Sequence, residues 1–254
     1  MYIDTHVHLN NKDLYEKIDT VMNDAKNVNV SKFFVVGYDL ETSKLAIKIA
    51  EKYDECFAII GFHPTEIKYY TDVEYNWLEE NITHPKVVAL GECGFDFHWD
   101  TTTKEEQLNS FIRQIEIAKK YNKPLSIHSR DALQLTYDTL KKYHADIIGG
   151  VMHSYSGSKE MAKEFIKLNF ILGISGPVTF KNGKVMKEVV EEIPLEYLIT
   201  ETDSPYLTPH PYRGKENGPK YIPLIIDEIS LIKGITKEKI EKQIEENVKK
   251  MFGV

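Results

Sequence analysis

Eight short apolar runs, rich in β-branched residues, alternate along the chain with longer stretches of helical period, and this alternation is the feature that most constrains the fold. Alternating strands and helices predict a parallel sheet with helices outside it. Eight such units closed on themselves give a (β/α)8 TIM-type barrel of about 250 residues, and this chain has 254, which we expect to form one domain, 1–254. The alternative is an open, doubly wound sheet. The expected strands are 2–8, 33–37, 56–63, 87–94, 124–128, 146–153, 170–175 and 197–203.

The expected helices are marked by apolar residues on one face and by residues typical of helix ends. Apolar residues share one face over 14–28, which predicts a single helix there. A threonine followed three residues later by a glutamate, at 71–74 and at 103–106, is typical of a capping box that opens a helix. The tail, 222–251, predicts two helices separated near Gly234.

Composition excludes several classes of protein. The net charge of −7 argues against wide, salt-driven binding along nucleic acid. It leaves room for a compact site that handles a phosphate through metal ions. No run approaches the roughly 18 apolar residues of a membrane span, and the start lacks a basic segment followed by an apolar one, so we expect neither a membrane span nor a signal peptide. Two cysteines without a CxxC motif favour a cytoplasmic protein without disulfides. Nothing in the sequence indicates an obligate protein partner.

Ionisable side chains stand at the ends of the expected strands. His6 and His8 end the first one, and residues two apart on a strand point to the same face. Both imidazoles can therefore reach one metal ion, although two hydrogen-bonded histidines would give the same pattern. Asp4 continues the alternation, and we expect it to orient a metal ligand.

Further candidate ligands follow other strands. Glu92 comes after the apolar run VVALG, where a buried carboxylate is costly unless it is paired or bound to metal. His128 and His153 end the fifth and sixth expected strands. Asp203 ends the eighth, with Glu201 two residues before it on the same face. Because strand ends meet at one mouth in a barrel, the four histidines and the carboxylates of Glu92 and Asp203 suit two divalent cations.

Three more residues are expected to face the substrate. His63 ends the third expected strand and is surplus to the six ligands, so we expect it to contact a phosphate or to transfer a proton. The chain has only three arginines, and two of them, Arg130 and Arg213, follow expected strands. A guanidinium suits bidentate phosphate binding, and ordinary surface arginines are the alternative.

The segments DTHVHL, GFHP, GECGFDF, IHSR, MHSYSGS and TETDSPYL, in this order and spacing, resemble the TatD family of metal-dependent deoxyribonucleases. That family belongs to the wider amidohydrolase-like group of metal-dependent hydrolases. The resemblance implies a TIM-type barrel with a metal site and hydrolysis of DNA phosphodiesters, typically from the 3′ end. By position it implies one metal ion on His6, His8, Glu92 and Asp203, and a second on Glu92, His128 and His153, with Glu92 bridging.

The expected chemistry is attack of an activated water on a phosphodiester. Asp203 would hold or relay the proton of that water, His63 and Arg130 would orient the phosphate, and Glu201 would support a ligand from behind. The ligand set suits two zinc, manganese or magnesium ions, and a small cationic mouth favours single-stranded or frayed 3′ ends of DNA. Two alternatives remain open. One is a hydrolase of another ester, such as D-aminoacyl-tRNA or a small phosphate ester, and the other is a barrel that binds metal or nucleic acid without turnover.

Overall fold

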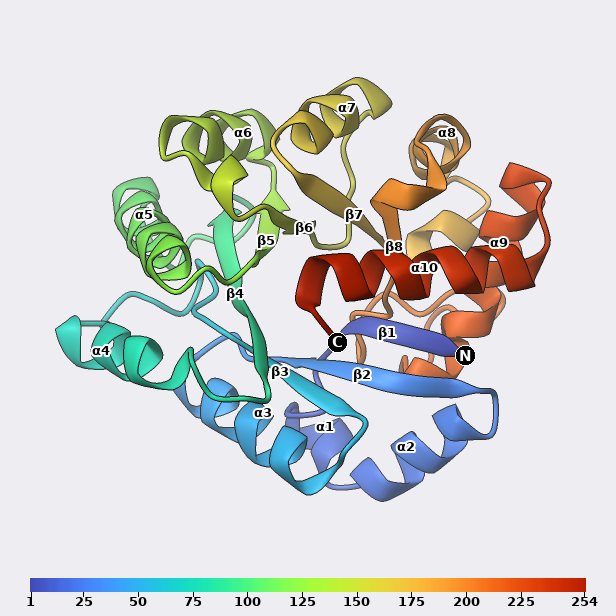
Figure 1. Ribbon diagram of the computed structural model, residues 1–254, viewed down its shortest axis with the longest axis horizontal. Helices are drawn as coiled ribbons and strands as arrows, with labels where there is room; N and C mark the ends of the chain where they lie inside the picture. Colours follow the sequence, from blue (N-terminus) through green and yellow to red (C-terminus); the bar gives the residue numbers. More distant parts are fainter.

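The computed structural model describes residues 1–254, and its eight strands form one sheet in chain order, with every neighbouring pair parallel. The first and last strands meet where Val7 bridges Ser204 in parallel and the His8 N–H donates to the Ser204 carbonyl, 3.0 Å away. Helices surround the sheet (Figure 1). The (β/α)8 TIM-type barrel is therefore confirmed. The strands are β1 (Tyr2–Val7), β2 (Val30–Val36), β3 (Cys56–Ile60), β4 (Val87–Asp96), β5 (Leu125–Arg130), β6 (Gly150–Met152), β7 (Phe170–Ile174) and β8 (Leu198–Thr200).

The helices begin and end largely where the sequence signals them. Both predicted capping boxes are formed, by Thr71 at the start of α4 and by Thr103 at the start of α5. Gly234, with a φ of 65°, ends α9 before α10 begins. No helix is both long and apolar enough to cross a bilayer. The helices are α1 (Lys12–Tyr15), α2 (Ile18–Lys26), α3 (Leu40–Lys52), α4 (Asp72–Asn81), α5 (Lys104–Lys120), α6 (Leu133–Lys142), α7 (Lys159–Lys167), α8 (Lys184–Glu192), α9 (Ile222–Lys233) and α10 (Lys237–Phe252).

Several sequence-based boundaries are wrong. The sixth strand, expected over 146–153, is only Gly150–Met152, because a 3-10 turn occupies Ala145–Ile147. The single helix expected over 14–28 is divided into α1 and α2, because Lys17 leaves the helical region at φ −129°. The apolar pattern reports the buried face that Leu14 and Met22 share, and not the continuity of the backbone. The third and eighth strands end early, at Ile60 and Thr200, so the residues expected at their ends lie in the loops that follow.

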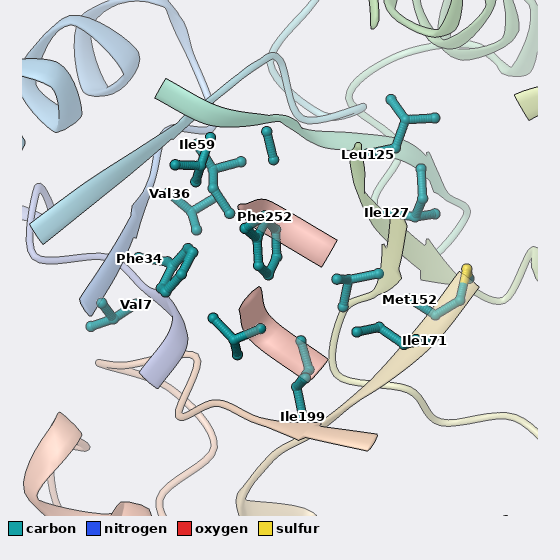
Figure 2. Close-up of a cluster of buried hydrophobic side chains, with 14 of the residues drawn as sticks. Val7, Phe34, Val36, Ile59, Leu125, Ile127, Met152, Ile171, Ile199 and Phe252 are labelled. Atoms are coloured by element: carbon teal, nitrogen blue, oxygen red, sulfur yellow. The ribbon is translucent and has the colours of Figure 1, made fainter. Parts of the chain in front are cut away.

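The core occupies both faces of the strands, as parallel sheets require. All ten residues of β4 are buried. Phe252 of α10 reaches among the strand side chains (Figure 2), with its ring 4.8 Å from that of Phe34. α10 is fixed against β8 by Asn247, whose amide donates to the carbonyls of Leu195 and Leu198 at 2.8 and 2.7 Å.

One glycine lets β4 and β5 approach each other at the end that carries the ionisable residues. Gly94 has a φ of +138° and pairs with His128, and a Cβ on it would lie 2.0 Å from the His128 carbonyl oxygen. Only glycine fits such a contact. The close approach places Glu92, two residues earlier on β4, beside the His128 ring.

Candidate metal centre

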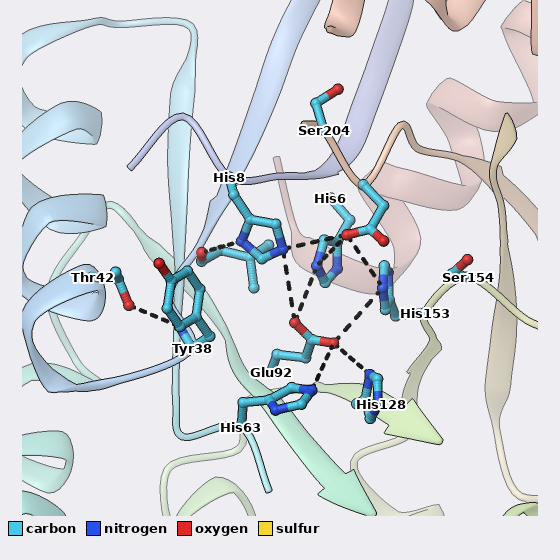
Figure 3. Close-up of polar contacts among 12 residues, drawn as sticks. His6, His8, Tyr38, Thr42, His63, Glu92, His128, His153, Ser154 and Ser204 are labelled. Carbon is cyan, nitrogen blue, oxygen red and sulfur yellow. Dashed lines mark hydrogen bonds and ion pairs between the residues drawn. The ribbon is translucent and has the colours of Figure 1, made fainter. Parts of the chain in front are cut away.

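Glu92 lies at the centre of a ring of histidines that come from the ends of three strands, β1, β5 and β6 (Figure 3). Its Oε2 atom is 3.5 Å from His6 Nε2 and 3.9 Å from His8 Nε2. Its Oε1 atom is 2.8 Å from His128 Nδ1 and 3.7 Å from His153 Nε2. The two oxygens of one carboxylate therefore face two different pairs of imidazoles.

Asp203 closes the ring from the loop after β8. Its Oδ1 atom lies 3.3 Å from His8 Nε2, 3.7 Å from His153 Nε2 and 3.9 Å from His6 Nε2. Its φ is +56°, so the alternation of a strand does not aim this side chain. The backbone does so instead, because the Asp203 N–H donates to the His6 carbonyl at 2.9 Å. The structure thus brings together all six side chains that the sequence proposed as ligands.

Partners outside the ring decide which nitrogen of each histidine faces inward. His8 Nδ1 lies 2.9 Å from the carbonyl of Val36, which can only accept, so the ring hydrogen sits on Nδ1 and the Nε2 lone pair faces the centre. His153 Nδ1 lies 2.9 Å from Glu201 Oε1, with the same result. Glu201 also accepts the Ser154 N–H at 2.5 Å, so its place behind a histidine agrees with the expectation.

Asp96 is a functional residue that the sequence reasoning undervalued. An aspartate in a Gly-rich segment such as GECGFDF often bonds its own backbone, and Oδ1 does accept from the N–H groups of His98 and Trp99, at 2.9 and 3.2 Å. Its other oxygen, however, lies 2.8 Å from His128 Nε2. Each ring nitrogen of His128 thus faces a carboxylate oxygen at 2.8 Å, and when an ion takes the place of the hydrogen on Nδ1, Asp96 holds the remaining hydrogen on Nε2. The signal was available, because Asp96 shares a strand face with Glu92 four residues earlier.

Asp4 contacts the backbone of a candidate ligand and not its ring, since it accepts the His6 N–H at 3.4 Å. Its side chain, which is fully buried, accepts from the N–H and the hydroxyl of Thr202 at 2.9 and 2.6 Å. Burial raises the pKa of Asp4 to about 7, against the opposing hydrogen bonds from Thr202. Asp4 therefore fastens the loop that carries Asp203 to β1.

His63 lies at the edge of the ring with its Nε2 atom 3.9 Å from Glu92 Oε1. Thr65 fixes the orientation of this ring, because its hydroxyl oxygen lies 2.7 Å from His63 Nδ1 and its N–H points at the same nitrogen from 3.2 Å, which leaves Nε2 facing the cavity. Burial, and next the neighbouring His128, lower the pKa of His63 to about 3. A ring that is neutral near pH 7 can form a hydrogen bond through Nε2 but is not a source of protons there.

The charges of the cluster favour cations. Burial alone would raise the pKa of the Glu92 carboxyl, but the charge of His153 and the neighbouring rings of His128 and His6 hold it well below its usual value. For Asp203 the charge of His153 and the neighbouring ring of His8 outweigh burial and lower the pKa. Both carboxylates are therefore ionised. Burial opposes a charge on His153, yet Glu201, Asp203 and Glu92 raise its pKa to about 10, so this ring must release a proton when its Nε2 binds a cation.

Divalent metal ions fit these residues. His6 is 1% exposed, and neither of its ring nitrogens has a hydrogen-bond partner, although buried polar atoms are almost always satisfied. Imidazole nitrogens and carboxylate oxygens are ligands for zinc and manganese. Three groups of donor atoms lie close enough to hold an ion: His6, His8 and Asp203; His6, His153 and Glu201; and His63, Glu92 and His128.

A cavity of about 680 Å³ opens above the cluster. Arg130 lines it, as expected, together with Trp99 and His63. Arg213 does not line it, contrary to the expectation that it overlooks the mouth. Its guanidinium lies over the ring of Phe180, 4.1 Å from the centroid, and the last residue of this loop that lines the cavity is Leu207.

Comparisons with known proteins agree with this geometry. The family model described as TatD related DNase matches residues 3–253. The uncharacterized metal-dependent hydrolase YabD of Bacillus subtilis is 43% identical, over 100% of both chains. The 3′-5′ ssDNA/RNA exonuclease TatD of Escherichia fergusonii is 30% identical, over 99% of this chain and 98% of its own.

A solved structure gives the same result. The crystal structure of YjjV, a TatD homologue from Escherichia coli, superimposes with a TM-score of 0.95 at 27% identity and covers 100% of this chain and 98% of its own. Fold, strand-end cluster and sequence relatives agree, and the chain belongs to the TatD-related DNase family of metal-dependent hydrolases.

Proposed function

We propose that this protein hydrolyses phosphodiester bonds at the 3′ end of single-stranded DNA with two divalent cations held by the strand-end cluster. One cation would bind His6, His8, Glu92 and Asp203, and the other Glu92, His128 and His153. When bound, the two cations supply positive charge to the phosphoryl oxygens and lower the pKa of the attacking water. Zinc, manganese and magnesium are the candidates.

The observation that carries the proposal is the split environment of Glu92. One oxygen faces His6 and His8, and the other faces His128 and His153. A carboxylate in this position is suited to bridge two cations, and a pair of cations is suited to clamp the attacking and leaving oxygens of a phosphodiester.

The protein's own residues have separate roles in this scheme. Asp203, ionised and exposed to the cavity, accepts the proton of the attacking water. His63 donates its Nε2–H to a phosphoryl oxygen, and the guanidinium of Arg130 pairs with the phosphate from the rim. Asp96 and Glu201 fix the rings of His128 and His153.

Two observations favour a strand end as the substrate. The relative from Escherichia fergusonii is named a 3′-5′ ssDNA/RNA exonuclease. The cavity is small and, of the chain's arginines, contains only Arg130 in a protein of net charge −7, so it would neutralise few phosphates. The cytoplasm is the proposed location, because Cys56 and Cys93 are both free thiols, and free thiols are typical of a reducing compartment.

The test is hydrolysis of single-stranded DNA labelled at either end, across zinc, manganese and magnesium, with a covalently closed single-stranded circle as the control. We expect stepwise shortening from the 3′ end and no cutting of the circle. Rapid cutting of the circle would refute exonuclease action. Deacylation of D-aminoacyl-tRNA without DNA hydrolysis would favour the other ester hydrolase instead, and metal binding without turnover on any of these would favour a binding barrel.

A further inference from the structure

Trp99 exposes a large aromatic surface at the rim of a polar cavity. The side chain is 56% exposed and lines the cavity above the candidate metal centre. The other tryptophan, Trp77 in α4, packs partly buried against the core. Exposed aromatic surface beside a concave site is typical of ligand contact, because apolar surface in water is unfavourable and a bound ligand would bury it.

The indole is fixed relative to the histidine cluster. Asp96 Oδ1 accepts from the backbone N–H of Trp99 at 3.2 Å, while Oδ2 of the same carboxylate holds His128. The ring of His98 meets the indole edge-on, with centroids 4.8 Å apart. One side chain therefore sets both the orientation of a metal-facing histidine and the position of Trp99.

The loop that carries Trp99 is braced on both sides. Gln107 accepts from the Asp96 N–H at 2.9 Å and donates to the Asp96 carbonyl at 2.8 Å and to the Thr102 hydroxyl at 3.1 Å. Thr102 in turn donates to the Pro64 carbonyl at 2.6 Å. A ligand that contacts Trp99 thus has little loop motion to arrest, which favours binding.

A cation lies near the indole. The guanidinium carbon of Arg130 lies over the Trp99 ring, 6.0 Å from its centroid, at the outer limit of a cation–π contact. A flat aromatic face and a free guanidinium, side by side, match the two parts of a nucleotide: the base stacks and the phosphate pairs.

We propose that Trp99 is the stacking platform for the unpaired base next to the scissile phosphate, and that this contact selects single-stranded ends. The inference rests on the proposed function. A base in a duplex stays stacked on its neighbours and cannot lie on the indole. Every base has a π face, so Trp99 confers preference for single strands with little preference for sequence.

The binding test uses fluorescence of the metal-loaded Trp77→Phe protein, in which Trp99 is the sole tryptophan. The probe is a thymidine tetranucleotide with phosphorothioate linkages, which resist hydrolysis, and the control probe has the same backbone with abasic residues. We expect saturable quenching with the first probe and little with the second. Equal quenching by both, or none by either, would overturn the proposal.

The kinetic test is a double-mutant cycle between protein and substrate. Trp99→Ala, and separately an abasic residue beside the cleaved bond, should each lower kcat/KM on single-stranded DNA by roughly 5- to 100-fold. Trp99→Ala acting on the abasic substrate should lower kcat/KM little more than either change alone. Trp99→Phe should restore part of the loss. Tyr69→Ala is the matched control, because Tyr69 is 82% exposed but does not line the cavity.

The failures are distinguishable. Wild-type protein that cleaves no DNA with any metal refutes the proposed function, and the fluorescence titration then decides the role of Trp99. Wild-type protein that cleaves, with Trp99→Ala equal to it or with losses that multiply in the cycle, refutes the platform alone. Metal content and circular dichroism of each variant are measured, and a Trp99→Ala protein that has lost metal would also contradict a purely substrate-binding role.

Discussion

Replacing Asp96 with asparagine should weaken one of two metal sites and leave the other intact. Asp96 Oδ1 accepts two backbone N–H groups, so the amide oxygen of an asparagine must take that place. The amide nitrogen then faces His128 Nε2 and donates to it. The ring hydrogen of His128 is forced onto Nδ1, the atom that lies 2.8 Å from Glu92, and Nδ1 no longer offers a lone pair.

The magnitude follows from the number of ligands affected. Loss of a partner that orients a metal-bound histidine costs about 10- to 100-fold in affinity, or about 1.4–2.7 kcal/mol. The ion on His128, His153 and Glu92 should weaken by this factor. The ion on His6, His8 and Asp203 should keep its affinity.

The assay is competition for Zn²⁺ between the metal-free protein and a chromophoric chelator. Wild-type protein should retain two ions of comparable affinity, and Asp96→Asn one tight and one weak ion. Asp100→Asn is the matched control, since Asp100 is exposed on the same loop and does not line the cavity. Two tight ions in Asp96→Asn would refute the argument from the ring hydrogen.

Variants at three cavity residues, with Cys93 as a control position, separate the roles of those residues. Glu92→Ala should abolish turnover and lower metal content while the barrel stays folded, whereas Cys93→Ala, on the opposite strand face, should keep most activity; active Glu92→Ala protein would remove Glu92 from the mechanism. His63→Gln should keep more kcat than His63→Ala, because an amide also donates a hydrogen bond, and equal losses in the two would indicate proton transfer. Arg130→Ala should lower kcat/KM by roughly ten- to a hundredfold, with partial rescue by Arg130→Lys and unchanged metal content; full activity of Arg130→Ala would exclude a phosphate contact.

The barrel and the strand-end residues were predictable for simple reasons. Alternating periods predict the order of elements, and parallel strands place their carboxyl ends together. The HxH pair at residues 6 and 8 needs only the twofold repeat of a strand. These rules concern the chain in sequence and require no knowledge of contacts between distant side chains.

What was missed depends on such contacts. The nitrogen that His128 offers is set by Asp96, and the loop of Asp203 is held by Asp4 through Thr202. Both hydrogen bonds join residues that are far apart in the sequence and that come together only in the folded barrel. The prediction that Arg213 faces the cavity was wrong for the same reason, since its contact with Phe180 forms only in the folded chain.

The proposed hydrolysis requires two cations bound at Glu92, and a metal titration tests this requirement directly. Metal-free protein, held above the dissociation constant of Mn²⁺, receives metal stepwise while release of the 3′-terminal nucleotide from single-stranded DNA is followed. We expect activity to rise to its maximum at two ions per chain and to be lost again on chelation. Full activity at one ion per chain, or activity that survives chelation, would contradict it.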